Sequence, residues 1–554
     1  MKPPSDGRTS PRARACAMGL LFLAGLLHAA AWAQAPAVPA VGAAASMADT
    51  AAEPTFDILE YVVEGATVLP IETVERAVYP HLGPGRRFAD VEAARKALET
   101  AYRSAGFGFA VVDIPEQNAT TGVIRLAVTE GRILRTRVTG AHYFSQGYIL
   151  ERVAGVAEGQ VPHLPTIQAQ LLDVNRTADR RVTPLLRPGL QPGTTEVDLA
   201  VEDKLPAHGS VTLNNQASRN TSPTRLQLAL SYDNLFQRDH GLALQAVISP
   251  EQPDEVKVLS AAYTVPLGPA GLEPLVFSAT RSDSEVVAGV GSTRLFGKGS
   301  IFGLRRSLLL DLADNRFQLL TLGVEYKDMK DSVQAGEGAG FDTPITYLPM
   351  SLGWTGAFRQ PAGDWQLGAT LSGGLRGLVN RQQEFGDKRY QAKASYALLR
   401  LDARHTRTLP WWGLRLRAQL ETQLSPDPLI ANEQFVLGGA ASVRGYLEAE
   451  AVGDLGLRGS LQLATPDLAS QLGWKALSSA SLYTFVDGAA AELRKPLPGQ
   501  PWRFRLLGLG LGAQMATLGR FPVTVSLDLA WPLQKQGLLG SDGPRAHASA
   551  SIGF

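Results

Sequence analysis

From about residue 208 to the C-terminus, apolar and polar residues alternate with a period of two, in segments of about ten residues separated by turn residues. In the segment Leu414 to Leu424, leucines and an alanine share one parity, while arginine, glutamine and glutamate share the other. Alternate side chains of a strand point to opposite faces, so each strand has one apolar and one polar face. The pattern predicts a large sheet whose charges all lie on one side.

A lipid environment explains why the charges keep to one parity. An arginine facing the middle of a bilayer costs a barrel about 2 to 4 kcal/mol, so the charged side must face the lumen. Unpaired amides at an open edge would cost several kcal/mol each in hydrocarbon, so the sheet must close. The lumen is therefore expected to be polar and filled with water. The residues expected to line it are Arg400, Arg404, Arg415, Arg417 and Glu421, with Glu421 and Asp402 forming ion pairs to the neighbouring Arg417 and Arg404.

The barrel is expected to span residues 206–554 and to contain about sixteen antiparallel strands, an even number as in bacterial outer-membrane barrels. Its last strand ends at Phe554, and a terminal aromatic residue in this setting is expected to serve as an assembly signal. A soluble secreted β-sandwich or propeller is the alternative. It is less favoured because the charges share one parity, the final residue is aromatic, and a leader is present without a lipid anchor.

The N-terminal residues 1–33 have the features of a secretory signal peptide. Basic residues precede an apolar run from Met18 to Trp32, and Ala31-Trp32-Ala33 is a small-x-small cleavage site. Cys16, the only cysteine, would leave with this leader, so neither a disulfide nor a thiolate metal site is expected in the mature chain. Residues 34–54 are rich in alanine and proline and are expected to form a flexible linker.

Composition and motif searches exclude several classes of function. The formal net charge is +1 for the whole chain, and the expected leader contributes +3 of it, so the mature chain is slightly acidic and has no nucleic-acid signature. After the leader, no uninterrupted apolar stretch reaches the roughly 18 residues of a membrane helix. The eight histidines lack zinc-site spacing, and no Gly-x-Ser-x-Gly elbow occurs. We therefore expect no enzyme activity, no cofactor, no metal site and no nucleic-acid partner.

Two consecutive segments, 55–130 and 131–205, repeat one pattern with a period of about 75 residues. Leu126-Ala127-Val128 in the first corresponds to Leu199-Ala200-Val201 in the second. The order strand, helix, helix, strand, strand resembles that of a POTRA domain, a small α+β sandwich. So small a sheet leaves an edge strand whose backbone groups can pair with an extended peptide, which favours a binding role. The alternative is that both units are spacers.

A long loop is expected between the strands that end near Leu424 and begin near Ala451, and it contains Val443-Arg444-Gly445-Tyr446. Together with the POTRA-like units, the barrel and the final aromatic residue, this tetrad resembles the TpsB transporters of two-partner secretion, the haemolysin secretion/activation family (ShlB/FhaC/HecB). In that family the tetrad tips an extracellular loop that folds back into the lumen. The resemblance implies the same assignment for Val443, Arg444, Gly445 and Tyr446.

The resemblance also implies a partner for the arginine, because the family places an aspartate in a Phe-x-Asp-x-Gly segment on a later strand. Here the segment is Phe485-Val486-Asp487, but Gly488 follows the aspartate directly and Ala489 stands where the pattern has glycine. A lumen-facing Asp487 could accept a bidentate guanidinium. In a wet lumen the pair is expected to contribute far less than the 3 to 5 kcal/mol of a truly buried one. The alternative is a solvated Arg444 and an Asp487 that begins a turn.

The resemblance implies an outer-membrane translocator with its POTRA domains in the periplasm. Its expected partners are a large secreted exoprotein of the TpsA type, outer-membrane lipids, and the outer-membrane assembly machinery during biogenesis. The alternatives are an assembly factor that inserts other barrels and a plain diffusion pore. Family members often carry an N-terminal plug helix and a long linker, but about twenty residues containing three prolines precede Phe56 after the cleavage site, so we expect a missing or reduced plug.

Overall fold

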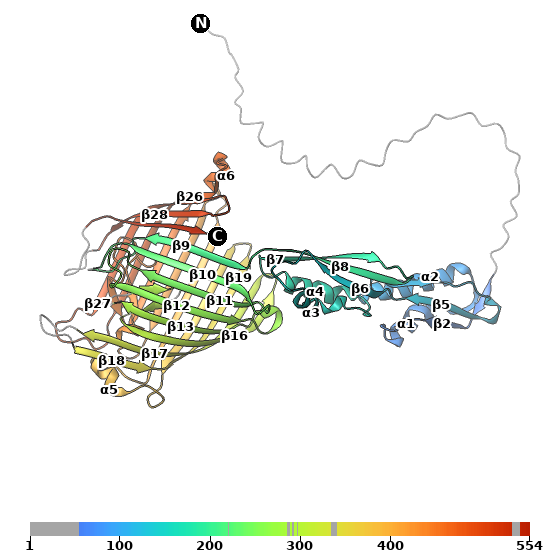
Figure 1. Cartoon of the computed structure of the whole chain (residues 1–554), viewed down its shortest axis with the longest axis horizontal. Helices are drawn as coiled ribbons and strands as arrows, with labels where there is room; N and C mark the ends of the chain where they lie inside the picture. Colours follow the sequence, from blue (N-terminus) through green and yellow to red (C-terminus); the bar gives the residue numbers. More distant parts are fainter. Residues whose placement is uncertain are drawn as a thin grey trace, which may run out of the picture.

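The computed structural model describes residues 55–219, 221–284, 288–290, 293–295, 297–333, 341–534 and 543–554. Two small α+β units form an arm that leads into one end of a closed β-barrel (Figure 1). The expected leader 1–33 and linker 34–54, and with them the expectation of a reduced plug, lie outside the described residues. Within the described ranges, no helix combines the length and the apolarity needed to cross a membrane.

The first unit packs two helices on a three-stranded sheet with the order β2-β5-β4. Strand β2 runs parallel to the central β5, and β4 runs antiparallel to it. Helix α2 buries Val91, Ala94 and Leu98, positions that recur every three or four residues on one helical face. The elements are β1 (Phe56–Ile58), β2 (Glu60–Glu64), α1 (Ile71–Val78), β3 (Gly83–Arg86), α2 (Phe88–Ser104), β4 (Val111–Asp113) and β5 (Val123–Thr129), with β1 and β3 paired separately.

The second unit has the same architecture, with the sheet order β6-β8-β7. Its apolar core includes Ile149 and Val153 from the helical layer and Leu199 from the central strand. Strand β6 is again parallel and β7 antiparallel to the central strand. The elements are β6 (Arg132–Thr139), α3 (Gln146–Arg152), α4 (Leu164–Val174), β7 (Arg180–Pro188) and β8 (Thr194–Asp203).

In both units a carboxylate accepts hydrogen bonds from backbone N–H groups of one turn, which indicates that the units are copies of one design. At the end of β5, the Glu130 carboxylate accepts hydrogen bonds from the backbone N–H groups of Thr67 and Val68, at 2.6 and 2.9 Å. At the end of β8, the Asp203 carboxylate accepts from the backbone N–H groups of His142, Tyr143 and Phe144. In each unit, a carboxylate at the end of the last strand therefore fixes the turn that follows the first long strand.

The barrel closes when β29 pairs with β9, the strand that follows the second unit. Seventeen strand segments form the ring, but β18 and β19 both pair with β17 and are interrupted only by Leu348, so they act as one strand of sixteen. The predicted fold class is confirmed. The ring consists of β9 (Ala207–Asn214), β10 (Arg225–Leu235), β11 (His240–Ile248), β12 (Val256–Val265), β13 (Leu275–Ser284), β16 (Gly299–Ala313), β17 (Arg316–Val333), β18 (Phe341–Tyr347), β19 (Pro349–Gln360), β20 (Gly363–Gly374), β21 (Tyr396–Thr408), β22 (Arg415–Leu424), β25 (Leu455–Ala464), β26 (Leu477–Glu492), β27 (Arg503–Thr517), β28 (Val523–Pro532) and β29 (Arg545–Gly553).

Short elements lie outside this ring. Strands β14 (Ala288–Val290) and β15 (Thr293–Leu295) form one hairpin. Helix α5 (Gln382–Lys388) lies between β20 and β21, at the end of the barrel away from the two units, and helix α6 (Leu468–Leu472) lies between β25 and β26 at the near end (Figure 1). Strands β23 (Phe435–Leu437) and β24 (Ala451–Gly453) pair within the loop that joins β22 to β25.

Candidate functional site in the barrel lumen

The loop that joins β22 to β25, residues 425–454, folds back into the lumen, and we call it the motif loop. Its tip carries the tetrad, in which Val443 and Tyr446 are 0% and 1% exposed. Both side chains belong to an apolar cluster with Leu506 of β27 and Ala491 of β26. The tip is therefore packed against the inner wall formed by these strands.

Arg444 at the tip forms a bidentate ion pair with Asp487 of β26. Its Nε lies 2.7 Å from Oδ2 of the carboxylate, and its Nη2 lies 2.9 Å from Oδ1. The backbone N–H of Arg444 also donates to Oδ2, at 3.1 Å, and the Ser460 hydroxyl donates to Oδ1, at 2.6 Å. A charge-assisted fork of this kind fixes orientation as well as adding energy. One carboxylate thus holds both the side chain and the backbone of the tip.

An aromatic ring and a second carboxylate complete the surroundings of the guanidinium. Its carbon lies 3.3 Å from the centroid of the Phe485 ring, which places the cation on a π face. Its Nη1 lies 3.6 Å from Oδ1 of Asp528 on β28. Asp528 and Ser460 were not predicted to be neighbours of Arg444. Their parity on alternating strands would have placed both in the lumen, but not beside Arg444.

The ion pair is buried, so the expectation that it lies in a wet lumen is wrong. The side chains of Arg444 and Asp487 keep 10% and 1% of their exposure. The reason is that the loop tip itself fills the space in front of β26 to β28 and excludes water. Removing one partner of a buried pair leaves an uncompensated charge, which typically costs about 3 to 5 kcal/mol.

Gly445 and Tyr446 secure the other side of the tip. Gly445 has a φ of 98°, in the region that favours glycine, and its N–H donates to Nε2 of His547 on β29, at 3.0 Å. The Tyr446 hydroxyl donates to the carbonyl oxygen of Gln534, at 2.7 Å. Ala489, where the family pattern has glycine, packs beside the Val443 and Tyr446 cluster, so this wall position accepts a methyl group.

A row of glycines on β27, which was not predicted to have a role, makes room for the tip. A Cβ on Gly508 would lie 2.1 Å from the carbonyl oxygen of Arg444. A Cβ on Gly510 would lie 2.4 Å from the Phe485 ring. The signal was present in the sequence, since Gly508, Gly510 and Gly512 share the lumen parity while leucines fill the outer one.

Two further buried carboxylates anchor the motif loop elsewhere. Glu433 accepts from Nζ of Lys327 on β17, at 2.8 Å, and from the Tyr347 hydroxyl on β18, at 2.9 Å. Asp454, at the end of the loop, is 0% exposed and pairs in a bidentate way with Arg389 from the loop that carries α5. The motif loop is therefore held to two wall regions and to a neighbouring loop.

An apolar cluster closes the end of the barrel away from the two units, which corrects the expectation of a polar, water-filled lumen there. Helix α5 contributes Phe385, whose ring lies 5.8 Å from Tyr347 and 5.9 Å from Tyr396. The motif loop contributes Leu429 and Ile430. Apolar residues at lumen-parity positions of the strand ends surround them, including Val247, Val258, Ile301, Met329, Ile345 and Leu398.

The residues predicted to line the lumen lie on one parity of β21 and β22. Arg400 donates from Nε to the side chain of Gln423, at 2.7 Å, and Arg404, Glu421 and Asp402 line one polar hollow. Arg415 and Arg417 share this parity. Glu421, however, pairs with Arg458 of β25 and not with Arg417 as predicted. Arg458 lies directly opposite Glu421 in the register, whereas Arg417 is four residues, about 13 Å, along the same strand.

Phe554 lies at the seam of the barrel. Its backbone N–H donates to the carbonyl oxygen of Gly209 on β9, at 3.0 Å, and its carbonyl accepts from the Gly209 N–H, at 3.2 Å. The last residue thus extends the pairing of β29 with the first barrel strand. Its role as an assembly signal stays a prediction.

One cluster contains side chains that could bind a metal ion, and its residues are too far apart in the sequence for their spacing to predict it. Among the described residues, Asp179, His208 and Asp233 lie close enough to share an ion. Nε2 of His208 is already 2.9 Å from Asp179 Oδ2, and Nζ of Lys204 is 3.6 Å from Asp179 Oδ1. Because the Lys204 ammonium and the His208 ring already contact this carboxylate, we assign the group to polar contacts within the chain.

Comparisons with known proteins agree with this architecture. The family described as haemolysin secretion/activation protein ShlB/FhaC/HecB matches residues 193–515, and the POTRA domain, ShlB-type, matches residues 56–131. The outer membrane transporter CdiB of Escherichia coli O6:K15:H31 (strain 536 / UPEC) is 26% identical over 418 residues, which cover 73% of this chain and 68% of that protein. The outer membrane transporter CdiB of Dickeya dadantii (strain 3937) is 31% identical over 162 residues, covering 28% and 27%.

Solved structures show the same fold. CdiB from Escherichia coli superposes with a TM-score of 0.59 at 20% identity, covering 92% of this chain and 93% of that one. BamA from Haemophilus ducreyi lacking POTRA domains 1–3 superposes with a TM-score of 0.54 at 13% identity, covering 90% and 100%. These likenesses concern the fold alone, whereas the family match spans more than half of the 554 residues. The chain therefore belongs to the haemolysin secretion/activation protein family (ShlB/FhaC/HecB), the TpsB-type outer-membrane transporters of two-partner secretion.

Proposed function

We propose that the first and second units, as POTRA 1 (55–130) and POTRA 2 (131–205), capture an unfolded secreted protein in the periplasm. The barrel (206–554) then exports it through the lumen. The leader (1–33) directs the chain to the periplasm, and the linker (34–54) precedes the capture units. The observation that carries the proposal is the buried Arg444–Asp487 pair, because it holds a long loop inside the path that a client must take. Arg444 and Asp487 act here as positioning residues.

Capture is proposed to occur by strand addition, in which main-chain hydrogen bonds tolerate varied client side chains. The four edge strands differ in what they offer. Strand β4 has three residues, and β7 contains Pro184 and Pro188, which lack N–H donors. Strand β6 already exchanges backbone hydrogen bonds with residues 159 and 160 through Ile133. We therefore propose β2, with five residues, as the first edge to receive the client.

Export requires both the motif loop and the apolar cluster around Phe385 to move, since both occupy the lumen. The periplasm supplies no nucleotide, so the driving force is proposed to come from folding of the client outside the cell. The ion pair would keep the loop in one defined arrangement between transport events. Its loss should therefore impair export more than barrel assembly.

We propose that the client is a large secreted protein encoded in the neighbouring reading frame. The test replaces Arg444 with alanine and measures secretion of this client. We expect secretion to fall at least about tenfold, the factor that 1.4 kcal/mol represents. Heat-modifiable migration on gels should remain, because the sixteen-strand ring does not depend on the loop. Arg404→Ala, at a lumen arginine outside the pair, is the matched control. Normal secretion by Arg444→Ala would overturn the assignment.

Pull-down with the full chain in detergent separates secretion from barrel assembly. A secretion transporter should recover the one neighbouring client, because its capture edges face a single partner. An assembly factor should instead recover several unrelated barrel precursors. Recovery of many precursors without the neighbouring protein would replace the proposed function with insertion of other barrels.

A further inference from the structure

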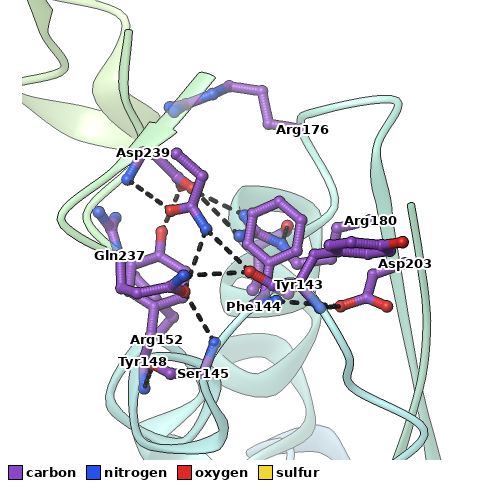
Figure 2. A network of polar contacts seen from close by, with 12 residues as sticks. Tyr143, Phe144, Ser145, Tyr148, Arg152, Arg176, Arg180, Asp203, Gln237 and Asp239 are labelled. Atoms are coloured by element: carbon purple, nitrogen blue, oxygen red, sulfur yellow. Dashed lines mark hydrogen bonds and ion pairs between the residues drawn. The ribbon is translucent and has the colours of Figure 1, made fainter. Parts of the chain in front are cut away.

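The turn between β10 and β11 is seated on the second unit, at the junction of the arm and the barrel (Figure 2). Phe236, Gln237 and Asp239 in this turn all have positive φ, between 55° and 59°. Such a backbone is uncommon for residues other than glycine and persists where the surroundings hold it. The pairing of β10 with β11 and the docking contacts together hold the turn in this conformation.

Arg180 at the start of β7 pairs with Asp239 in this turn. Nη1 and Nη2 of Arg180 lie 3.1 and 3.2 Å from Oδ1 and Oδ2 of Asp239. The two side chains are 0% and 4% exposed, so each charge depends on the other. The Tyr148 hydroxyl donates to the same carboxylate, and Nε of Arg180 donates to the carbonyl oxygen of Val174, at 2.7 Å. The pair is thus satisfied on both sides of the junction.

Aromatic rings and amides surround the pair. The Arg180 guanidinium lies 4.4 Å from the centroid of the Phe144 ring. The Gln237 amide accepts from the backbone N–H of Ser145, at 2.8 Å, and donates to the carbonyl oxygen of Tyr143, at 3.1 Å (Figure 2). Residues 143 and 144 are the ones whose N–H groups Asp203 holds within the second unit. The barrel turn therefore contacts a rigid part of this unit.

We propose that the Arg180–Asp239 pair locks the second unit in one orientation at the mouth of the barrel, so that captured client is aimed at the lumen. The chain connection from β8 to β9 alone is one covalent point, which permits rotation, and domains joined in this way usually move. The β10–β11 turn supplies a second fixed point. Arg180 and Asp239 are positioning residues, and the aiming of client rests on the proposed function.

The orientation itself can be measured without a client. Spin labels at Ala157→Cys in the second unit and Lys475→Cys beyond α6 report the distance between the arm and the barrel in a Cys16→Ser background. The wild-type distance distribution should be narrow. Asp239→Ala should broaden it at least about twofold, because the unpaired Arg180 no longer holds the turn. Asp239→Asn, which keeps the shape but not the charge, should broaden it less.

Arg137→Ala is the matched control, because it removes an exposed pair to Asp198, at 3.0 Å, from the same unit. It should leave the distribution unchanged. A broad distribution in the wild type, an unchanged one in Asp239→Ala, or equal broadening by the control would each overturn the lock. Heat-modifiable migration identifies variants with an intact barrel, and the wild-type width remains decisive if both Asp239 variants fail to assemble.

A second measurement separates the lock from the proposed function. The neighbouring secreted protein should still bind Asp239→Ala in a pull-down, while its secretion falls. Loss of binding by Asp239→Ala, or undiminished secretion by it, would contradict the aiming role. If wild type fails to bind the neighbouring protein, the proposed function fails, whereas the distance measurements still decide whether the lock exists.

Discussion

Two buried bidentate Arg–Asp pairs, one through Nε and Nη2 and the other through Nη1 and Nη2, fix two different regions of this molecule. In the lumen, Arg444 contacts Asp487 at 2.7 and 2.9 Å, and at the junction Arg180 contacts Asp239 at 3.1 and 3.2 Å. Both guanidinium groups lie over a phenylalanine ring. In each case a connecting segment of the barrel, a loop or a turn, is tied to an element far along the chain. Buried bidentate pairing is thus used twice to hold connections that would otherwise be free to move.

The two pairs differ in whether the residues next to them in the sequence form a recognisable motif. Arg444 belongs to a tetrad in which each residue contacts the wall, and Asp487 follows an aromatic residue of the same parity. Arg180 follows the end of a helix, and Asp239 lies in a polar turn that looks solvated in the sequence. The pair within the barrel can be recognised from a sequence motif. The pair that depends on how the second unit docks on the barrel has no such motif.

The largest expected effect comes from removing either carboxylate. Asp487→Ala should cost about 3 to 5 kcal/mol at the motif loop, because it leaves Arg444 charged and buried without a partner. Limited proteolysis of the full chain in detergent should then cleave within residues 425–454, where the wild type resists. The distance between Ala157 and Lys475 labels should stay unchanged.

Asp239→Ala should give the reverse pattern, with a broadened distance distribution and a motif loop that resists the protease.

The control for Asp487→Ala is Asp528→Ala. It removes the more distant carboxylate, 3.6 Å from Arg444, and should expose the loop less than Asp487→Ala does. If either carboxylate variant altered both regions, the two pairs would not be independent and the comparison would fail.

The limits of sequence analysis follow from the same physics. Period-two alternation predicts the sixteen strands because lipid outside and polar groups inside act on every residue of a strand. It cannot predict that Phe385, Leu429 and Ile430 fill the far end of the lumen, because loop residues carry no periodicity. The same rule misassigned Glu421, whose partner Arg458 comes from the next strand in the sheet and depends on register.

The candidate site was predictable where a family motif reports on it. The tetrad and Asp487 were found in this way, and the structure brings Arg444 and Asp487 together. Ser460 and Asp528 were not found, since parity places a residue in the lumen without saying which neighbour it meets. Burial of the pair was also missed, because it arises from the loop filling its own surroundings.

The next largest effect concerns space at the loop tip. Gly508→Ala should cost about 1 to 3 kcal/mol, because its Cβ would lie 2.1 Å from the carbonyl oxygen of Arg444 and the tip must shift. Protease sensitivity of the motif loop should therefore rise, though less than in Asp487→Ala. Gly488→Ala is the matched control, since its Cβ would meet only the Leu507 side chain, at 3.6 Å. Equal sensitivity of both variants would show that the glycine row does not position the tip.

The smallest expected effect concerns Glu130, a buried carboxylate without a bidentate arginine partner. The question is whether such a carboxylate also fixes a turn. Burial raises the pKa of Glu130, but hydrogen bonds from Thr67, Val68 and Tyr102 outweigh it and hold the pKa below its usual value. A lowered folded pKa means that this stabilisation is complete above the unfolded pKa, about 4.3, and is lost as the pH falls through the folded value.

Hydrogen exchange of the Thr67 and Val68 amides measures this turn directly. Their protection, corrected for the intrinsic exchange rate, should stay constant from neutral pH down to about 4 and then fall. Glu130→Gln keeps one acceptor oxygen but loses the charge, so its protection should be lower at neutral pH and should not change on acidification. The Tyr143 and Phe144 amides, held by Asp203 in the second unit, provide the comparison within the same sample. If protection in Glu130→Gln fell with the same pH profile as in the wild type, another group would control the turn, and ionised carboxylates would fix connections only where an arginine shares the burial.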